Sequence, residues 1–158
     1  MRNVVLAVAT STMVALGTSA QTRPDFTGVW QLDAARSGTS AYSEAPGPVS
    51  LSITQSAAEI QIATTTSRGT THVSYVFATP DGPRPEGVPL ARWQGDALLT
   101  EAVRNIRGQS VTVQQTRRLD SDGREMIVES IVNVQHGYSA TGAKTYGSGR
   151  DVFVRAPR

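Results

Sequence analysis

The sequence predicts an all-β fold, in which eight or nine strands form an antiparallel up-and-down meander that closes into a barrel. Three observations lead to this prediction. No stretch after Asp25 repeats apolar residues at helical spacing, short runs alternate apolar and polar residues, and turn-forming residues separate those runs. We expect closure because an open meander would expose two strand edges, which a barrel pairs with each other.

The predicted strands are rich in β-branched residues, which pack well on a half-buried pleated surface. In chain order they are 27–33, 49–55, 59–66, 70–78, 88–94, 97–104, 109–119, 125–135 and 151–155. Short hairpin turns are predicted at 67–69, 95–96, 105–108 and 121–123, where Gly, Asn, Asp and Ser gather. Longer connections are predicted at 34–48, 80–87 and 137–149, since prolines or glycines there disfavour ladder pairing.

Loop lengths predict which face of each strand points into the barrel. A four-residue loop at 120–123 would place Leu119 opposite Arg124 and turn the mostly apolar face inward. That face consists of Val111, Val113, Gln115, Arg117, Leu119, Met126, Val128, Ser130 and Val132. The same reasoning carried backwards adds Leu98, Thr100, Ala102, Trp93 and Ala91. The other face of the 88–104 hairpin is equally apolar, so a register that buries Arg92 and Glu101 stays open.

The first twenty residues differ in composition from the rest. A short charged start precedes an apolar run at 4–17 and small residues at 18–20, which is typical of a cleaved secretory signal. We expect a signal peptide at 1–20 and one barrel domain at 21–158. The apolar run is shorter than the roughly 20 residues that span a bilayer, which argues against a membrane anchor, and no transmembrane segment is expected after cleavage. The lack of cysteine favours a secreted or periplasmic bacterial protein over one from a eukaryotic secretory route, where small domains are often stapled by disulfides.

Charge and motif content exclude several classes of function. Of the 15 basic and 13 acidic residues, only Arg2 lies within 1–20, so 21–158 is nearly neutral and no nucleic-acid surface is expected. His72 and His136 are the only histidines, fewer than the three ligands of a typical catalytic zinc site, so no metal is predicted. The segment 137–142 misses the spacing of a nucleophile elbow by one residue, and no cofactor is predicted.

Three ordered motifs resemble the lipocalin/calycin superfamily, and more closely a group of short exported bacterial lipocalin-like proteins. The first is the Gly28-Val-Trp30 strand together with Arg36-Ser37. The second is the Arg92-Trp-Gln-Gly-Asp-Ala-Leu98 hairpin, and the third is the Leu119-Asp-Ser-Asp-Gly-Arg124 turn. The resemblance implies a lipocalin-like barrel in which Trp30, after Gly28, plugs one end. Arg155 or Arg150 on the last strand would then lie over Trp30 in a cation–π contact.

A few polar or aromatic side chains are expected to point into an otherwise aliphatic interior. They are Tyr75, Trp93, Gln115, Arg117 and Ser130. Such a mixture is typical of a cavity that orients one small ligand, and Arg117 would suit an anionic head group. The leading hypothesis is therefore an exported barrel that binds a small hydrophobic or amphipathic molecule without chemistry.

Three alternatives stay open. Arg117 could lie near the barrel mouth and reach solvent, which would remove its functional meaning. The domain could be a structural or interaction module of the cell envelope with a filled core and active loops at 34–48 and 80–87. It could also be an isomerase or cyclase, which would require Glu101 or Glu129 to point inward.

Overall fold

The all-β prediction is confirmed by a computed structural model, which describes residues 23–38, 47–79, 82, 87–106, 109–135 and 144–157. Its nine strands are β1 (Gly28–Leu32), β2 (Ser50–Gln55), β3 (Glu59–Thr66), β4 (Gly69–Phe77), β5 (Leu90–Gln94), β6 (Ala97–Ile106), β7 (Gln109–Leu119), β8 (Glu125–Gln135) and β9 (Lys144–Arg155). The predicted signal peptide at 1–20, His136 and the 137–142 motif lie outside the described residues. No helix in the described part of the chain is long and apolar enough to cross a membrane.

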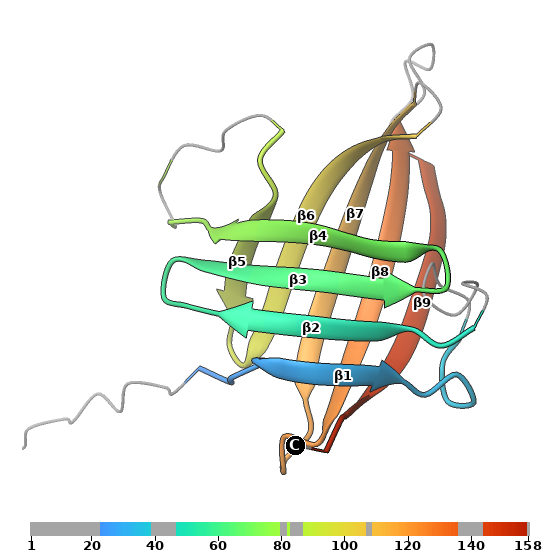
Figure 1. The fold of residues 1–158 in the computed structure, drawn as a ribbon. Coiled ribbons are helices and arrows are strands. Elements are labelled where there is room, and N and C mark those ends of the chain that lie inside the picture. Colours follow the sequence, from blue (N-terminus) through green and yellow to red (C-terminus); the bar gives the residue numbers. More distant parts are fainter. Residues whose placement is uncertain are drawn as a thin grey trace, which may run out of the picture.

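The strands close into a ring in chain order, as predicted (Figure 1). Each strand is a neighbour of the next, and β1 closes the ring by pairing antiparallel with β9. In that last ladder Trp30 is the partner of Arg155 and Leu32 is the partner of Phe153. The meander therefore leaves no free edge at its two ends, which is the advantage of closure for an all-β chain.

One pair of neighbours departs from the predicted antiparallel meander. β4 and β5 run parallel, joined only through Val76 with Leu90 and Phe77 with Ala91. Strands that alternate in direction all the way round a closed ring must be even in number, and this ring has nine. At least one neighbouring pair must therefore run the same way. It falls where the proline-containing 78–89 connection prevents a tight hairpin.

The last strand is also longer than predicted. The sequence predicts a strand at 151–155 after a glycine-rich connection, whereas β9 begins at Lys144. Its ladder with β8 begins where Lys144 pairs with Val134 and ends where Val154 pairs with Glu125, with an irregularity at Val132 and Asn133. Pairing with the full length of β8 thus outweighs the weak strand propensity of Gly147 and Gly149.

The predicted inward faces are correct, although two ladders are shifted by two residues. Leu119 pairs with Met126, whereas the predicted partner was Arg124. Gln109 pairs with Ile106, whereas the predicted partner was Arg104. Because side chains alternate with a period of two, a shift of two residues leaves every face unchanged. In the 88–104 hairpin Arg92 is exposed and Ala91 is buried, which rules out the alternative register.

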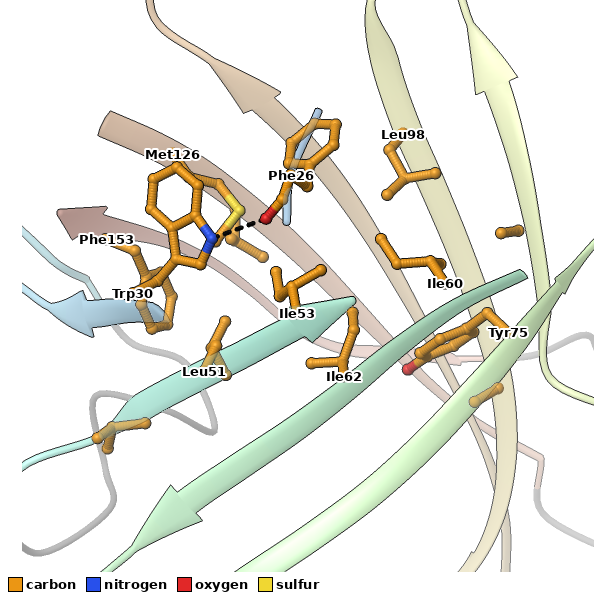
Figure 2. Packing of buried hydrophobic residues seen from close by; sticks show 14 residues of the cluster. Phe26, Trp30, Leu51, Ile53, Ile60, Ile62, Tyr75, Leu98, Met126 and Phe153 are labelled. Carbon is orange, nitrogen blue, oxygen red and sulfur yellow. Dashed lines mark hydrogen bonds between the residues drawn. The ribbon is translucent and has the colours of Figure 1, made fainter. Parts of the chain in front are cut away.

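The interior is packed with apolar side chains, among which Phe26, Trp30, Met126 and Phe153 lie close together (Figure 2). The buried cluster consists of Phe26, Trp30, Val49, Leu51, Ile53, Ile60, Ile62, Tyr75, Ala91, Leu98, Ala102, Met126, Val128 and Phe153. The indole N–H of Trp30 donates to the Phe26 carbonyl at 2.9 Å, so its one polar atom is satisfied inside the core. The end of the barrel that contains Trp30 and Phe26 is called the closed end below.

A strap of residues 23–27 holds the closed end shut. Gln55 on β2 accepts the Phe26 N–H at 3.1 Å and donates to the Pro24 carbonyl at 3.1 Å. From the last strand, Arg155 donates to the carbonyls of Thr27 and Asp25. The strap is thus bonded to strands from both ends of the chain, and Phe26 is pressed into the core.

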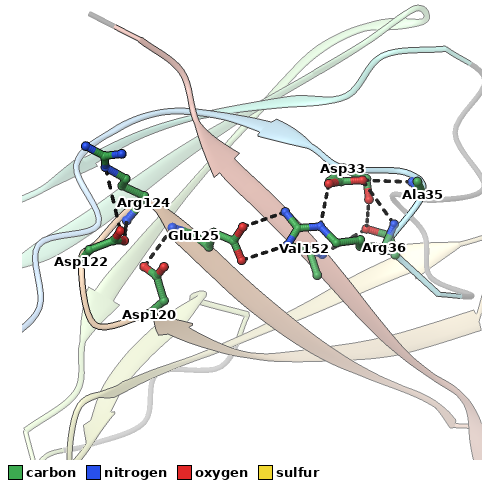
Figure 3. A network of polar contacts seen from close by, with 9 residues as sticks. Asp33, Ala35, Arg36, Asp120, Asp122, Arg124, Glu125 and Val152 are labelled. Atoms are coloured by element: carbon green, nitrogen blue, oxygen red, sulfur yellow. Dashed lines mark hydrogen bonds and ion pairs between the residues drawn. The ribbon is translucent and has the colours of Figure 1, made fainter.

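A surface network of ion pairs joins the end of β1 to the start of β8 (Figure 3). Arg36 contacts Asp33 at 2.7 Å and Glu125 at 2.8 Å. The hydrogen bond from Arg36 lowers the pKa of Asp33 below its usual value. In the adjoining β7–β8 turn the Glu125 N–H donates to the Asp120 carboxylate at 2.9 Å and lowers the pKa of Asp120 in the same way.

Candidate ligand-binding site

A row of polar side chains crosses the middle of the barrel interior. Thr100 on β6, Gln115 on β7 and Ser130 on β8 are register partners on neighbouring strands, and all three are buried. Their amides and hydroxyls therefore lie side by side at one height of the wall. Gln115 donates from Nε2 to the Ser130 hydroxyl at 3.1 Å, which links the row into one network.

Arg117 lies one inward position nearer the closed end and reaches up to this row. It donates from Nη1 to the Thr100 hydroxyl at 2.6 Å and from Nη2 to the Gln115 carbonyl oxygen, Oε1, at 2.5 Å. Its side chain is 0% exposed, so the alternative in which Arg117 reaches solvent is wrong. The register explains this burial, because Arg117 pairs with Leu98 on one side and Val128 on the other, in the packed part of the core.

The hydrogen bonds of Arg117 go to neutral groups. None of the four ion pairs found among the described residues includes it. Its Nε is buried without a hydrogen-bond partner in the described part of the chain. A guanidinium gains less from neutral hydrogen-bond acceptors than from a carboxylate that accepts the same hydrogen bonds, because charge-assisted hydrogen bonds are stronger.

Two residues of this cluster were not predicted as site residues from the sequence. Thr100 was assigned to the interior but not to the site, although its hydroxyl accepts a hydrogen bond from Arg117 Nη1 at 2.6 Å. Asp151 on β9 is 0% exposed and pairs with Val128, so it shares a register row with Arg117 across β8. Alternation with the buried Phe153 could have revealed it, because residues two apart on a strand share a face.

The two aromatic candidates lie at other places in the same interior. Tyr75 on β4 is buried within the apolar cluster. Trp93 on β5 stacks on Phe77 at 5.7 Å between ring centroids and lies 6.1 Å from Phe26. Its indole N–H is buried with no partner among the described residues, while Arg23 of the strap covers the ring. Neither side chain takes part in the hydrogen bonds of Arg117, and contact of either with a ligand stays a prediction.

The predicted plug residues lie together at the closed end. Trp30 is fully buried, and the guanidinium carbon of Arg155 is 4.2 Å from its ring centroid. Arg150, the other proposed partner, is exposed on β9. Gly28 has a φ of 142°, and a Cβ built there would lie 2.7 Å from Nη1 of Arg155. Glycine at this position therefore makes room for the arginine that covers Trp30.

The two glutamates that an enzyme would need inward point outward. Glu101 accepts a hydrogen bond from Gln114 at 2.7 Å on the outer face of β6 and β7. Glu129 forms an exposed ion pair with Arg118 at 3.1 Å. Neither can act on a molecule inside the barrel. Within the described residues no group of three His, Cys, Asp or Glu side chains could hold a metal ion.

Exposure of the inward face increases away from the closed end. Along β4, Tyr75 is buried, Val73 is half-buried and Thr71 is exposed, although all three share the inward face. On β9 a Cβ added to Gly147 would meet no atom within 4 Å. The barrel is therefore solid at the Trp30 end and looser at the other, with the Arg117 cluster between the two.

Comparisons with known proteins found similar structures but no sequence relative. No family model and no curated protein matches the chain. A variant of the fluorescent protein UnaG is 15% identical, with a TM-score of 0.45, and the match covers 84% of this chain and 97% of that one. The REP1-NXSQ fatty acid transporter is 12% identical, with a TM-score of 0.43, and the match covers 84% of this chain and 96% of that one.

A third similar structure is the zebrafish ileal bile acid-binding protein in complex with cholic acid. It is 11% identical, has a TM-score of 0.44, and the match covers 83% of this chain and 98% of that one. At such low identity the similarity concerns the course of the chain, and no functional residue is transferred from any of the three.

Proposed function

We propose that this barrel binds a small amphipathic molecule whose head group carries hydrogen-bond acceptors, a carboxylate being the best match. The head would meet Arg117, Gln115, Thr100 and Ser130, and the tail would lie along the looser, aliphatic part of the interior. We further propose that the protein does this outside the bacterial cytoplasm, which the signal-like composition of 1–20 and the absence of cysteine support.

The burial of Arg117 is the observation on which this proposal rests. A charged side chain kept wholly inside a barrel is unfavourable unless it is compensated, and its hydrogen-bond partners here are neutral. The amide oxygen of Gln115 occupies the position of an acceptor that a carboxylate oxygen would fill more strongly. A ligand head that displaces this amide would gain a charge-assisted hydrogen bond.

A filled structural module is the second candidate, and the density of the core favours it. Arg117 has no exposed surface, so a ligand must move side chains to reach it. In that case the Arg117 cluster would serve stability only. The two candidates differ in one measurable respect, which is whether a carboxylate binds in an Arg117-dependent manner.

The test compares dodecanoate with dodecanol, which has the same tail but no carboxylate. Binding is measured by calorimetry and by the emission of Trp93 in a Trp30→Phe background. We expect the carboxylate to bind at least about ten times more tightly than the alcohol, or about 1.4 kcal/mol. Arg117→Met should abolish that preference.

Arg118→Met is the matched control, because Arg118 is the next residue on β7 and points outward. It should leave both affinities unchanged. Circular dichroism establishes that each variant is folded, and Arg117→Lys, which keeps a charge, serves if the methionine variant unfolds. Failure of both molecules to bind folded wild-type protein would leave the filled module as the better description.

A further inference from the structure

The weakest part of the barrel wall is the junction between β4 and β5, here called the seam: Val76 and Phe77 with Leu90 and Ala91. Only these two residues of each strand are in register. The backbone hydrogen bonds across the junction include those from Val76 N–H to the Pro89 carbonyl and from Ala78 N–H to the Ala91 carbonyl. By contrast, the ladder between β3 and β4 extends from the pair of Glu59 with Val76 to the pair of Thr66 with Gly69.

The strands diverge beyond the seam. β4 and β5 cross at a large angle in Figure 1, and Gly69–Tyr75 of β4 have no register partner on the β5 side. The exposure of the inward-facing Thr71 fits this divergence. Separating the two strands at the seam would therefore break fewer register pairs than separating any antiparallel pair of the wall, of which the shortest, between β1 and β9, has three.

Apolar side chains are exposed on both sides of the seam. Val76 on β4 is 45% exposed, Val88 just before β5 is 40% exposed and Val103 on β6 is 50% exposed. They are three of the six large apolar residues that are exposed in the described part of the chain. Clustered exposed apolar residues usually mark a surface that contacts another apolar group.

A hollow lined by both apolar and charged side chains, among them Arg92, Glu101 and Glu129, lies on the outer face beside the same junction. Its volume is about 260 Å³, and Ala78 and Leu90 form its edge at the seam. Leu99 and Ile131, from β6 and β8, extend its apolar lining away from the junction. The seam thus has a partly apolar hollow on its outer side, in which part of a lipid-like tail would find apolar contacts.

On its inner side the seam leads to the polar cluster. Phe77 and Ala91 are its inward residues, and Ala91 is the register partner of Thr100, which pairs in turn with Gln115. A molecule passing between β4 and β5 would reach Thr100 directly after the methyl group of Ala91. This is the row that holds the guanidinium of Arg117.

We infer that the seam is the entrance through which the ligand of the proposed function passes, by transient separation of β4 from β5. The inference rests on the proposed function, but it concerns the route and not the affinity. An entrance at the seam controls association and dissociation rates equally and leaves the equilibrium constant unchanged.

A disulfide across the seam tests the route, and the absence of native cysteine makes the variant unambiguous. Val76 and Leu90 are register partners, so their Cα atoms lie about one strand spacing, roughly 5 Å, apart, within the range that a disulfide bridges. In Val76→Cys/Leu90→Cys we expect oxidation to slow dodecanoate association and dissociation at least tenfold in stopped-flow fluorescence. The affinity should stay the same, and reduction should restore both rates.

Thr54→Cys/Gln61→Cys is the matched control, because it joins register partners on the outer face of the antiparallel β2–β3 ladder. Its oxidation should leave the rates unchanged. If the seam disulfide does not form, a short bismaleimide cross-linker provides the same restraint. Normal rates with a locked seam would overturn the entrance and keep the binding site, whereas no binding in any form would refute the proposed function itself.

Discussion

Arg155 lies over Trp30, with its guanidinium carbon 4.2 Å from the ring centroid, and the two residues are register partners in the ladder that closes the barrel. The same guanidinium donates from Nε to the Gly123 carbonyl at 2.9 Å and from Nη1 to the Thr27 carbonyl at 2.5 Å. One side chain therefore joins the strap, the β7–β8 turn and the first and last strands.

Replacing Arg155 by methionine should weaken the fold strongly. Methionine keeps the aliphatic cover of Trp30 but loses the cation–π contact and the hydrogen bonds to the strap, so we expect a loss of about 2–4 kcal/mol in the free energy of unfolding. Urea denaturation measures this difference in the free energy of unfolding between the wild type and the variant. The control is Arg118→Met, whose exposed ion pair with Glu129 should matter by less than about 1 kcal/mol. Equal effects of the two substitutions would contradict the closing role of Arg155.

Gly28→Ala tests whether the absence of a side chain at residue 28 is needed to make room for the guanidinium of Arg155. The added methyl would lie 2.7 Å from Nη1 of Arg155, and the φ of 142° strains any residue with a side chain. We expect a loss of about 1–3 kcal/mol in wild-type protein. In an Arg155→Met background the clash is absent, so the loss should be smaller, and a double-mutant cycle measures the difference. An additive cycle would show that the two residues act independently.

Thr100→Val removes an acceptor from the buried guanidinium without changing the volume of the side chain. Arg117 Nη1 then loses its partner at 2.6 Å, and a buried charged donor left unsatisfied should lower the free energy of unfolding by about 1–3 kcal/mol. Thr116→Val is the control on the adjacent strand, because Thr116 lies on the outer face. Calorimetric unfolding of both variants provides the comparison, and a neutral Thr100→Val would mean that Arg117 finds another acceptor.

Acid should destabilise the fold below about pH 4. The pKa values of Asp33 and Asp120 are lowered by hydrogen bonds, and that of Glu59 is lowered by hydrogen bonds from Ser74 and Gln61. A carboxyl whose pKa is lower in the folded state stabilises it above the unfolded pKa of about 4. That stability is lost as the pH falls through the folded values.

Arg36→Met isolates one part of this acid effect. Arg36 is the largest cause of the lowered pKa of Asp33, so its removal should lower the Tm near pH 7 and make the Tm fall less steeply on acidification. Thermal unfolding between pH 7 and pH 2.5 measures both. Parallel curves for the wild type and the variant would show that the Arg36 network does not contribute to the acid transition.

The strands and their inward faces could be predicted because alternation is a local property. A shift of two residues in the β6–β7 and β7–β8 ladders did not matter, since faces repeat every two residues. The parallel seam could not be predicted in this way. It follows from the strand count of the closed ring, and a ninth strand was only one of the two possibilities that the pattern allowed.

The candidate site was predictable in its composition but not in its connections. Alternation placed Gln115, Arg117 and Ser130 inside, yet the partner of Arg117 is Thr100 on another strand, which only the register reveals. Asp151 was missed because the predicted strand at 151–155 was not assigned an inward face, although alternation with Phe153 would have placed Asp151 inside. Long-range geometry, and not residue type, decides which of these polar groups meet.

The parallel junction of β4 with β5 has a consequence for how such a barrel can change. No substitution can convert that neighbour pair into an antiparallel one, because the mismatch belongs to the number nine and not to any side chain. Only the gain or loss of a whole strand would remove it. Every closed barrel with an odd number of strands must therefore contain at least one parallel pair of neighbouring strands. Evolution can change only where in the barrel wall that pair lies.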